Sequence, residues 1–406
     1  MLTDLAEYLV GRQVQVYVIC SRQLYEKPRA RLPKREVHAG VRVVRIVGTR
    51  FGRSSRLGRL ADYVSFYAIA TIQLATMLRR GDVLVTMTDP PMLSVIGAGV
   101  ARLRGCTLIN WLQDVFPEVA SRLEGTAMPA WLERSLRALR DASLRRAHCN
   151  VVIGERMREY IIARAVPAPR VQVIENWADG EAIRPRPSAW SALRRKLDAA
   201  ASFIVEYSGN LGRAHDYHTL LLAAERLRSR RDIVFLMVGG GVGMTALREE
   251  VDARRLRNVR FLPYQPRDRL CDSLAAGNVH LLSLLPAMEG LIVPSKLYGI
   301  LAAGRPTLFV GDVDGEMARA LAAGSCGMSV PLGAGGALAA AIERAADDPV
   351  AVDRMGQAAR RLFDERYSLN SACDRWSAVL GVLTTGSAQV STPDVGGPAG
   401  SRQFGT

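Results

Sequence analysis

The sequence predicts an α/β protein made of two doubly wound, Rossmann-like domains that face each other across a cleft. Short continuous apolar runs alternate with helix-length segments, and such runs are typical of parallel strands covered on both faces. The runs form two sets of six, separated by a polar, proline-rich stretch at 183–190. The expected strands are 14–20, 42–47, 83–86, 106–112, 149–154 and 171–175, then 202–207, 232–239, 258–262, 278–284, 305–310 and 326–329.

The same alternation predicts the domain boundaries. We expect an N-terminal domain at 1–185 and a C-terminal domain at 186–366. A helix at 367–385 is expected to pack back on the N-terminal domain. Residues 386–406 are rich in small and polar residues and are expected to form a disordered tail.

The beginning of the chain departs from the usual pattern. An amphipathic helix, with Leu2, Leu5, Ala6 and Leu9 on one face, leads directly into a strand. A nucleotide-binding α/β domain normally opens with a strand and a glycine-rich turn before its first helix. We therefore expect a truncated N-terminal domain that lacks this strand and loop; the alternative is a variant sheet.

The positive charge of this 406-residue chain, formally +15, is concentrated near the N-terminus. Residues 22–80 hold fourteen Arg or Lys and three acidic residues, a local surplus of +11. Such a patch can face nucleic acid, anionic lipid or a phosphorylated substrate. The uncharged run 63–78, with arginines on both sides, either lies in a membrane interface or is a buried helix with solvated ends.

Composition restricts the remaining possibilities. No apolar run reaches the roughly 18–20 residues that span a bilayer. The six cysteines are scattered, without zinc or redox spacing, and the five histidines form no metal-ligand pattern. We expect a cytoplasmic protein without a metal cofactor, with 50–80 as its candidate contact to the anionic inner membrane face.

The most informative segment is 286–309, PAMEGLIVPSKLYGILAAGRPTLF. Pro294 suits the start of a helix, Ser295 can cap its free N–H groups, and Gly304 can end it. Exposed N–H groups and Lys296 would bind an anion, while the carboxylate of Glu289 can accept sugar O–H bonds. The pattern fits a ligand that carries both hydroxyls and phosphate; the alternative is an ordinary turn with solvated side chains.

A second candidate segment is 206–220, EYSGNLGRAHDYHTL, where a strand ends and a helix begins. Gly209 and Gly212 allow positive φ and close backbone approach to a phosphate. Arg213 can clamp a diphosphate with two hydrogen bonds. The position of this segment at the first crossover of the second domain favours phosphate binding. Glycines around Gly240 give similar freedom, or form only a strand-to-helix turn.

In the first domain, NWLQDVFPE at 110–118 follows a strand. Trp111, Gln113 and Asp114 are expected to face the crevice at the carboxyl edge of the sheet, where ligands of open α/β sheets bind. The alternative is a capping aspartate and a packed tryptophan. Asn176, in VIENWADG, is a further cleft candidate, whereas Asp179 is expected only to shape a turn.

Together these segments resemble the nucleotide-sugar glycosyltransferases of the GT-B architecture, in the large retaining family numbered 4. The likeness extends over residues 3–385 and is strongest to bacterial surface-polysaccharide enzymes of the amino-sugar branch. Its most specific pieces are WLQDVFPE, SGNLGRAHD, VIENWAD, NVRFLPYQP, VPSKLYGILAAGRP and GDVDGE. The resemblance implies transfer of a sugar, an N-acetylamino sugar, from a UDP-linked donor with retained anomeric configuration. The implied acceptor is a saccharide or a polyprenyl-diphosphate-linked sugar, used in capsule, O-antigen or exopolysaccharide synthesis.

The resemblance also assigns roles to individual residues. Glu289 corresponds to the first of the family's paired glutamates, which contacts the donor sugar, and Gly299 occupies the place of the second. The family's usual phosphate-binding Arg and Lys fall at Asn210 and His215. Arg213 and Lys296 are therefore the candidates that supply the charge, with Glu289 as the third catalytic residue. The implied donor-binding set is Gly209, Asn210, Gly212, His215, Gly240, Pro294, Ser295 and Leu297.

Three other functions remain open from the sequence. A nucleotide-sugar epimerase of the same shape would form product without any acceptor. A nucleic-acid-binding protein would use the basic region. However, no nucleic-acid-binding module is recognisable, and we do not expect the chain to bind nucleic acid. A non-catalytic scaffold is the third alternative.

Overall fold

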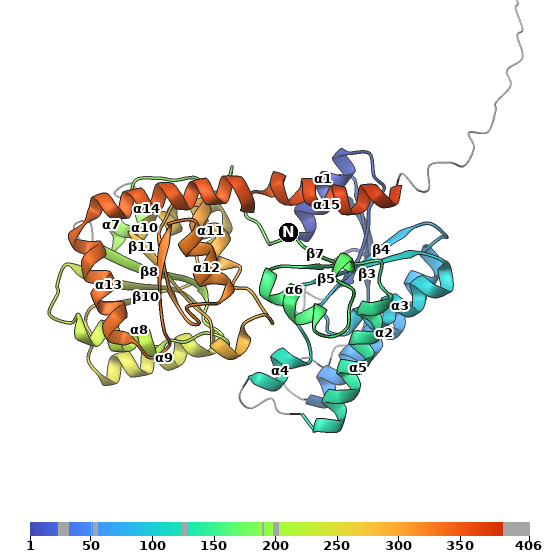
Figure 1. Cartoon of the computed structure of the whole chain (residues 1–406), viewed down its shortest axis with the longest axis horizontal. Helices are drawn as coiled ribbons and strands as arrows, with labels where there is room; N and C mark the ends of the chain where they lie inside the picture. Colours follow the sequence, from blue (N-terminus) through green and yellow to red (C-terminus); the bar gives the residue numbers. More distant parts are fainter. Residues whose placement is uncertain are drawn as a thin grey trace, which may run out of the picture.

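The structure, a computed structural model, describes residues 1–22, 32–49, 51, 56–123, 128–188, 191–197 and 203–384 (Figure 1). The predicted tail at 386–406 and the predicted contact residues Arg50 and Arg53 lie outside this part of the chain. The described chain forms two α/β domains, as the sequence predicts.

The strands of the N-terminal domain form two sheets. The strands β1, β3 and β2 make a three-stranded sheet in the order β1-β3-β2, and β4 to β7 make a parallel sheet in sequence order. Its elements are α1 (Leu2–Gly11), β1 (Tyr17–Ser21), β2 (Arg35–His38), β3 (Val41–Ile46), α2 (Arg56–Met77), β4 (Val83–Met87), α3 (Leu93–Arg104), β5 (Thr107–Leu112), α4 (Glu118–Arg122), α5 (Ala130–Arg146), β6 (Cys149–Val152), α6 (Glu155–Ile162) and β7 (Val171–Val173).

The strand β2 has no counterpart among the strands expected from the sequence. Its residues, REVH, are mostly exposed and pair antiparallel with β3, with Glu36 opposite Val43. An edge strand with one apolar residue lacks the continuous run on which the prediction relied.

The C-terminal domain has one six-stranded parallel sheet in the order β10-β9-β8-β11-β12-β13. The strand order reverses between β8 and β11, and ligands of open α/β sheets bind at such a switch point. Its elements are α7 (Ala192–Lys196), β8 (Phe203–Asn210), α8 (His218–Arg226), β9 (Ile233–Gly240), α9 (Val242–Ala253), β10 (Val259–Leu262), α10 (Leu270–Ala276), β11 (Val279–Ser283), α11 (Lys296–Ala302), β12 (Thr307–Val310), α12 (Glu316–Ala323), β13 (Gly327–Val330), α13 (Gly335–Asp347) and α14 (Pro349–Leu362).

The last helix, α15 (Leu369–Thr384), packs on the N-terminal domain (Figure 1). Its Cys373 and Trp376 are fully buried in the same apolar core as Leu5 and Trp111. The chain therefore leaves the N-terminal domain, completes the C-terminal one and returns to the first. This return joins the two domains at a site away from their facing edges.

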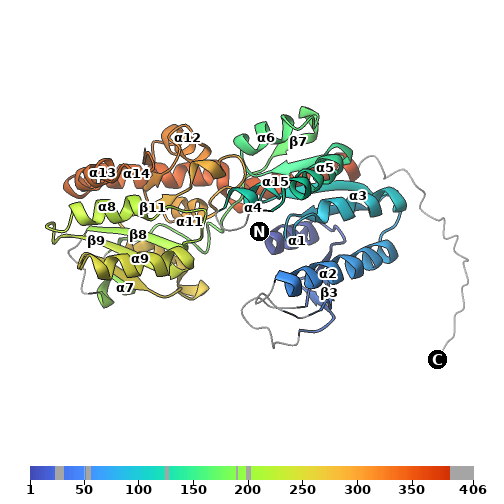
Figure 2. The same cartoon turned by 90° about the horizontal axis from the view of Figure 1, so that it is seen from below.

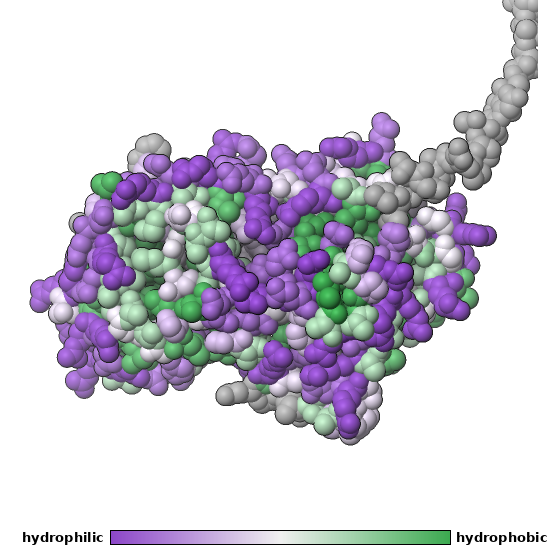
Figure 3. Space-filling model, in the orientation of Figure 1, coloured by the Kyte–Doolittle hydropathy of each residue, from purple (hydrophilic) through white to green (hydrophobic). Residues whose placement is uncertain are grey.

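The facing edges of the domains also meet directly. Asp114, after β5, forms an antiparallel bridge with Ile292, and the N–H of Val115 donates to the carbonyl of Leu291 at 3.0 Å. A guanidinium N–H of Arg122 donates to the carbonyl of Ala287, in the C-terminal domain, at 2.8 Å. On the face shown in Figure 3, hydrophilic residues gather where the two domains meet.

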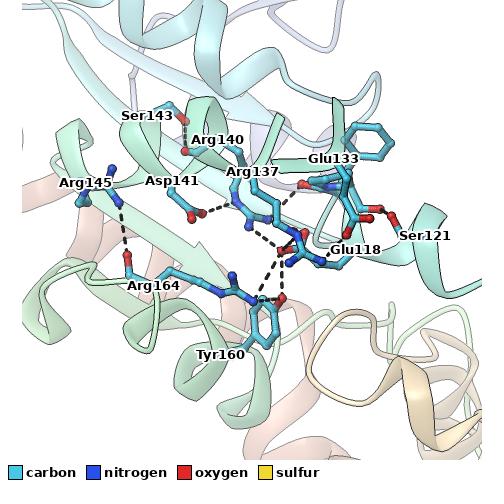
Figure 4. A network of polar contacts seen from close by, with 12 residues as sticks. Glu118, Ser121, Glu133, Arg137, Arg140, Asp141, Ser143, Arg145, Tyr160 and Arg164 are labelled. Atoms are coloured by element: carbon cyan, nitrogen blue, oxygen red, sulfur yellow. Dashed lines mark hydrogen bonds and ion pairs between the residues drawn. The ribbon is translucent and has the colours of Figure 1, made fainter. Parts of the chain in front are cut away.

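A buried charge network fixes the loop that follows β5 (Figure 4). Glu118, the first residue of α4, is fully buried and accepts hydrogen bonds from Arg140 at 2.8 and 3.0 Å. The hydroxyl of Tyr160 donates to the same carboxylate at 2.9 Å, and Arg140 also binds the carbonyl of Phe116. Burial alone would raise the pKa of Glu118, but the hydrogen bonds and charge of Arg140 lower it below its usual value.

We expect Glu118→Ala to lower the free energy of unfolding by about 3–5 kcal/mol, because the buried Arg140 guanidinium loses the carboxylate that binds two of its nitrogens and keeps the contact with Asp141. Urea titration at neutral pH measures this loss. Since the pKa of Glu118 is lower in the folded state, its contribution is present above the unfolded pKa and is lost as the pH falls through the folded one. An Asp232→Ala variant, which breaks an exposed ion pair, should change stability far less; equal losses in both variants would contradict the assignment.

No helix in the described ranges is both long and apolar enough to cross a membrane.

Candidate functional site

The candidate site lies at the carboxyl ends of β8 and β11, the switch point of the C-terminal sheet. After β8 the chain turns through Gly209–Gly212 to His215, and after β11 it runs through Glu289 to Lys296 at the start of α11. Parallel strands place their carboxyl ends on one edge of the sheet. The two segments, about eighty residues apart in sequence, therefore meet there.

Lys296 and His215 are in direct contact. The ammonium Nζ of Lys296 lies 3.0 Å from Nε2 of His215, and Nδ1 of His215 lies 2.5 Å from the carbonyl oxygen of Ser283. Because an ammonium can only donate, Nε2 is the acceptor and Nδ1 carries the proton that Ser283 accepts. Nζ also lies 5.3 Å from the ring centroid of Tyr207, which places the cation over an aromatic face.

Burial lowers the pKa of both His215 and Lys296. Burial, and secondarily the charge of Lys296, lowers the pKa of His215 to about 4, so the imidazole is neutral near pH 7. Burial lowers the pKa of Lys296 to about 8, so its ammonium is mostly charged there. The result is a half-buried cation held by a neutral histidine, an arrangement that favours an incoming anion.

Two glycine-containing turns interlock beside this cation. The N–H of Leu211 donates to the carbonyl of Gly240 at 2.8 Å, and the N–H of Gly243 donates to the carbonyl of Leu211 at 2.9 Å. Asn210 is exposed at the end of β8, and a Cβ added at Gly241 would lie 2.3 Å from its Oδ1. The turns after β8 and β9 thus form one surface, and the predicted donor-binding residues Gly209, Asn210, Gly212, His215 and Gly240 lie on it or beside it.

Gly209 is one of the positions where this surface requires glycine, and the one beside Lys296. Its φ is +126°, and a Cβ there would lie 2.8 Å from Cε of Lys296. We expect Gly209→Ala to displace Lys296 and to cost about 1–2 kcal/mol of stability through backbone strain. Thermal unfolding and titration with UDP measure the two effects. Gly99→Ala, in helix α3 with no atom near the added Cβ, is the control and should leave UDP affinity unchanged; equal affinity in both variants would contradict this placement.

Glu289 lies at the end of the short helical turn Pro286–Met288 and faces the start of α12. Its Oε2 accepts the N–H of Glu316 at 3.2 Å, whereas its Oε1 is buried without a hydrogen-bond partner. Burial raises the pKa of this carboxyl, and the nearby Asp312 and Glu316 raise it further, although the N–H of Glu316 opposes the shift. One oxygen of Glu289 thus has a structural role, and the other is buried beside Gly315 without a hydrogen-bond partner.

The carboxylate of Glu316 extends this arrangement into the N-terminal domain. Its Oε2 accepts the N–H of Arg156 at 2.8 Å, in the first turn of α6. The Arg156 guanidinium donates to the carbonyl of Asp314 at 2.9 Å. Glu289 is therefore one hydrogen bond removed from the contact between the domains.

The residues around α11 differ in part from the sequence prediction. Ser295 forms no side-chain cap, because its backbone already has helical angles. Leu297 is fully buried in the apolar core, and its N–H donates to the carbonyl of Pro294 at 3.3 Å. Its donor-binding role stays a prediction. Pro294 is buried and shapes the entry to the helix. A Cβ at Gly299 would meet the apolar side chains of Leu274 and Ile183 at 3.6 and 3.9 Å.

In the N-terminal domain Gln113 and Asn176 form a reciprocal amide pair. Nε2 of Gln113 lies 3.1 Å from Oδ1 of Asn176, and Nδ2 of Asn176 lies 2.7 Å from Oε1 of Gln113. The pair joins the segments that follow β5 and β7. Asp179 caps a turn by accepting the N–H groups of Glu181 and Ala182, as expected.

Trp111 and Asp114 have different surroundings from those predicted. Trp111 is fully buried between Trp177 and Trp376, with ring centroids 5.8 and 4.8 Å away, so its predicted place facing the crevice is wrong. The strand β5 is covered on both faces, and this residue points to the face that α15 covers. Asp114 lies at the contact between the domains; its Oδ1 is buried without a partner, and burial raises its pKa.

Sequence reasoning missed Tyr207, Arg156 and Glu316. Arg213, a predicted catalytic residue, is exposed two positions before His215. In the described ranges no group of three or more His, Cys, Asp or Glu residues is placed to hold a metal ion.

Two family models match this chain. Residues 1–177 match the glycosyl transferase 4-like domain, and residues 190–362 match the glycosyl transferases group 1 domain. The chain is therefore a glycosyltransferase of the GT-B fold, with one model for each of its two α/β domains.

Individual relatives agree with this assignment. The probable glycosyltransferase WbjE of Pseudomonas aeruginosa is 26% identical over 311 residues, which are 76% of this chain and 77% of the relative. The putative colanic acid biosynthesis glycosyl transferase WcaI of Escherichia coli is 28% identical over 224 residues, 54% of this chain and 55% of the relative. Among solved structures, Anabaena HepE in complex with UDP and glucose superimposes with a TM-score of 0.72 at 16% identity, covering 94% of this chain and 95% of that one.

Proposed function

We propose that this chain transfers an N-acetylamino sugar from a UDP-linked donor to a polyprenyl-diphosphate-linked or saccharide acceptor, with retention, in surface-polysaccharide synthesis. The observation that carries the proposal is the half-buried ammonium of Lys296, held by a neutral His215 at the switch point of the C-terminal sheet. A relative named for colanic acid biosynthesis supports the pathway class, and a similar fold solved with UDP supports the nucleotide.

The residues of the site suit departure of a nucleoside diphosphate. Breaking the bond between the anomeric carbon and the diphosphate leaves negative charge on the phosphate oxygens. We propose that Lys296 and Arg213 stabilise this charge. In the proposed front-face displacement the acceptor oxygen bonds to the anomeric carbon on the face from which the diphosphate departs. Its proton passes to the departing diphosphate. Because side-chain cations supply the charge, we propose that the transfer needs no metal ion.

Glu289 is proposed to bind the donor sugar. Its Oε1 has no partner and can accept a hydrogen bond from a sugar hydroxyl, while Oε2 remains fixed by the N–H of Glu316. On the acceptor side, Asp114 and the amide pair of Gln113 and Asn176 are proposed to line the cleft.

A panel of nucleotide sugars tests this function. Thermal unfolding of the chain is followed with UDP-N-acetylglucosamine, UDP-glucose and GDP-mannose, and a lipid-linked sugar is then added to look for transfer with and without a chelator. A stabilising shift with the UDP-linked amino sugar and chelator-resistant transfer are the expected results. Product formed from the nucleotide sugar alone would favour the epimerase instead, and the absence of any shift would contradict the proposal.

A further inference from the structure

Helix α2 exposes a row of apolar side chains on the surface of the N-terminal domain. Leu60 and Val64 are each 58% exposed and Ile72 is 65% exposed, with Ala68 exposed between them. These positions recur every fourth residue, which keeps neighbouring members on the same side of a helix. Figure 2 shows α2 beside α3 at the outer edge of this domain.

The exposed side of α2 is unlike that of a helix that faces water. Between Leu60 and Leu78 the single charged residue is Asp62. Its carboxylate accepts hydrogen bonds from the Thr49 hydroxyl at 2.8 Å and from the N–H of Phe51 at 3.1 Å. A solvated helix face normally carries charged or polar residues, so an uncharged one indicates a contact surface.

Other residues of α2, and Leu78 directly after it, already have their partners. Leu74 and Leu78 pack against the core formed by Leu84, Ala101 and Leu108. The hydroxyl of Tyr67 donates to the carbonyl of Pro91, which fixes the helix to the segment after β4. Changes on the exposed row can therefore be made without disturbing the packed side.

The charge of the sequence that contains α2 indicates the kind of partner. Residues 22–80 carry a surplus of +11, and Arg79 and Arg80 are exposed directly after the helix. A second copy of the chain would bring two strongly positive regions together, which is unfavourable. A nucleic acid would neutralise the charge but would leave the alkyl side chains in water. An anionic membrane surface satisfies both, because its headgroups attract arginine and its interface accepts apolar side chains.

We propose that α2 lies on an anionic membrane surface, with Leu60, Val64 and Ile72 inserted at the interface and Arg79 and Arg80 on the headgroups. The exposure and charge of α2 carry this proposal, which stands whether or not the assignment of the donor holds. It places the N-terminal domain at the membrane.

Vesicle flotation of the full chain tests the proposal. Vesicles of phosphatidylcholine alone are compared with vesicles that also contain phosphatidylglycerol. We expect the chain to float with the anionic vesicles, and the binding to weaken as salt is raised. The triple variant Leu60→Ser, Val64→Ser, Ile72→Ser should bind the anionic vesicles at least tenfold more weakly, since each apolar side chain contributes to insertion.

A matched triple variant separates this surface from exposed apolar residues in general. Val242, Val313 and Val350 are 58%, 47% and 66% exposed in the C-terminal domain. Their replacement by serine should leave flotation unchanged. Equal flotation of the α2 variant and the native chain would overturn the proposal, as would equal binding to the two kinds of vesicle. A native dimer in solution that the α2 variant converts to monomer would assign the row to a second copy and would also overturn it.

Discussion

Lys296→Ala should lower kcat/KM by roughly 100-fold or more, the scale of losing one group that stabilises the charge of a transition state. The ammonium is half-buried and contacts neutral His215, so no nearby histidine charge replaces it. Steady-state transfer and UDP titration measure the effect on turnover and on binding. Arg213→Ala, which removes an exposed cation, should lower the affinity for UDP less than Lys296→Ala does.

The pH dependence gives an independent measurement of the same residue. The pKa of Lys296 is lowered to about 8 by burial, so the ammonium is present below that pH and is lost above it. UDP affinity should therefore fall as the pH rises through about 8. Binding near that pH should take up protons, because the diphosphate favours the charged form; calorimetry in buffers of different ionisation enthalpy measures this uptake.

The control is Lys34→Ala, which removes an exposed lysine from the other domain. It should leave both kcat/KM and the pH profile of soluble-donor binding unchanged. If Lys296→Ala and Arg213→Ala both keep native rates, the phosphate site lies elsewhere. If the step near pH 8 persists in Lys296→Ala, another group titrates there.

The fold was largely predictable because its strands have a strong signal. A buried parallel strand is a continuous apolar run, and each of the twelve expected runs overlaps a strand in the structure. The strand β2 was missed because half of its residues are charged and most are exposed at the edge of a sheet. The division of the N-terminal strands into two sheets depends on pairing between distant segments, which no local pattern carries.

The site was less predictable, because a motif locates a segment but not the direction of each side chain. Trp111 and Leu297 occur in informative segments, yet both are fully buried. When both faces of a strand or a short helix are covered, the periodicity that would distinguish the core side from the ligand side is absent. The contact between Lys296 and His215 requires β8 and β11 to be neighbours, and that follows from the crossover order of the sheet.

The second large effect is expected for Glu289→Gln, which should lower turnover by roughly 100-fold and leave UDP affinity nearly unchanged. Glutamine keeps an oxygen that can accept the N–H of Glu316, so the contact at the start of α12 survives. It replaces the unpartnered Oε1 by an NH₂ group, which donates and cannot accept a sugar hydroxyl. Transfer kinetics and UDP titration on the same preparation separate the two quantities.

The exposed residue Asp314 supplies the matched control for this change. Asp314→Asn removes one negative charge from the same region without altering a side chain that faces the candidate sugar site. Loss of turnover in Glu289→Gln but not in Asp314→Asn would assign the effect to the hydrogen bond that Oε1 accepts. Loss of UDP affinity with turnover intact would place Glu289 at the nucleotide. Equal losses in the two variants would mean that the local charge, and not this oxygen, is what the reaction requires.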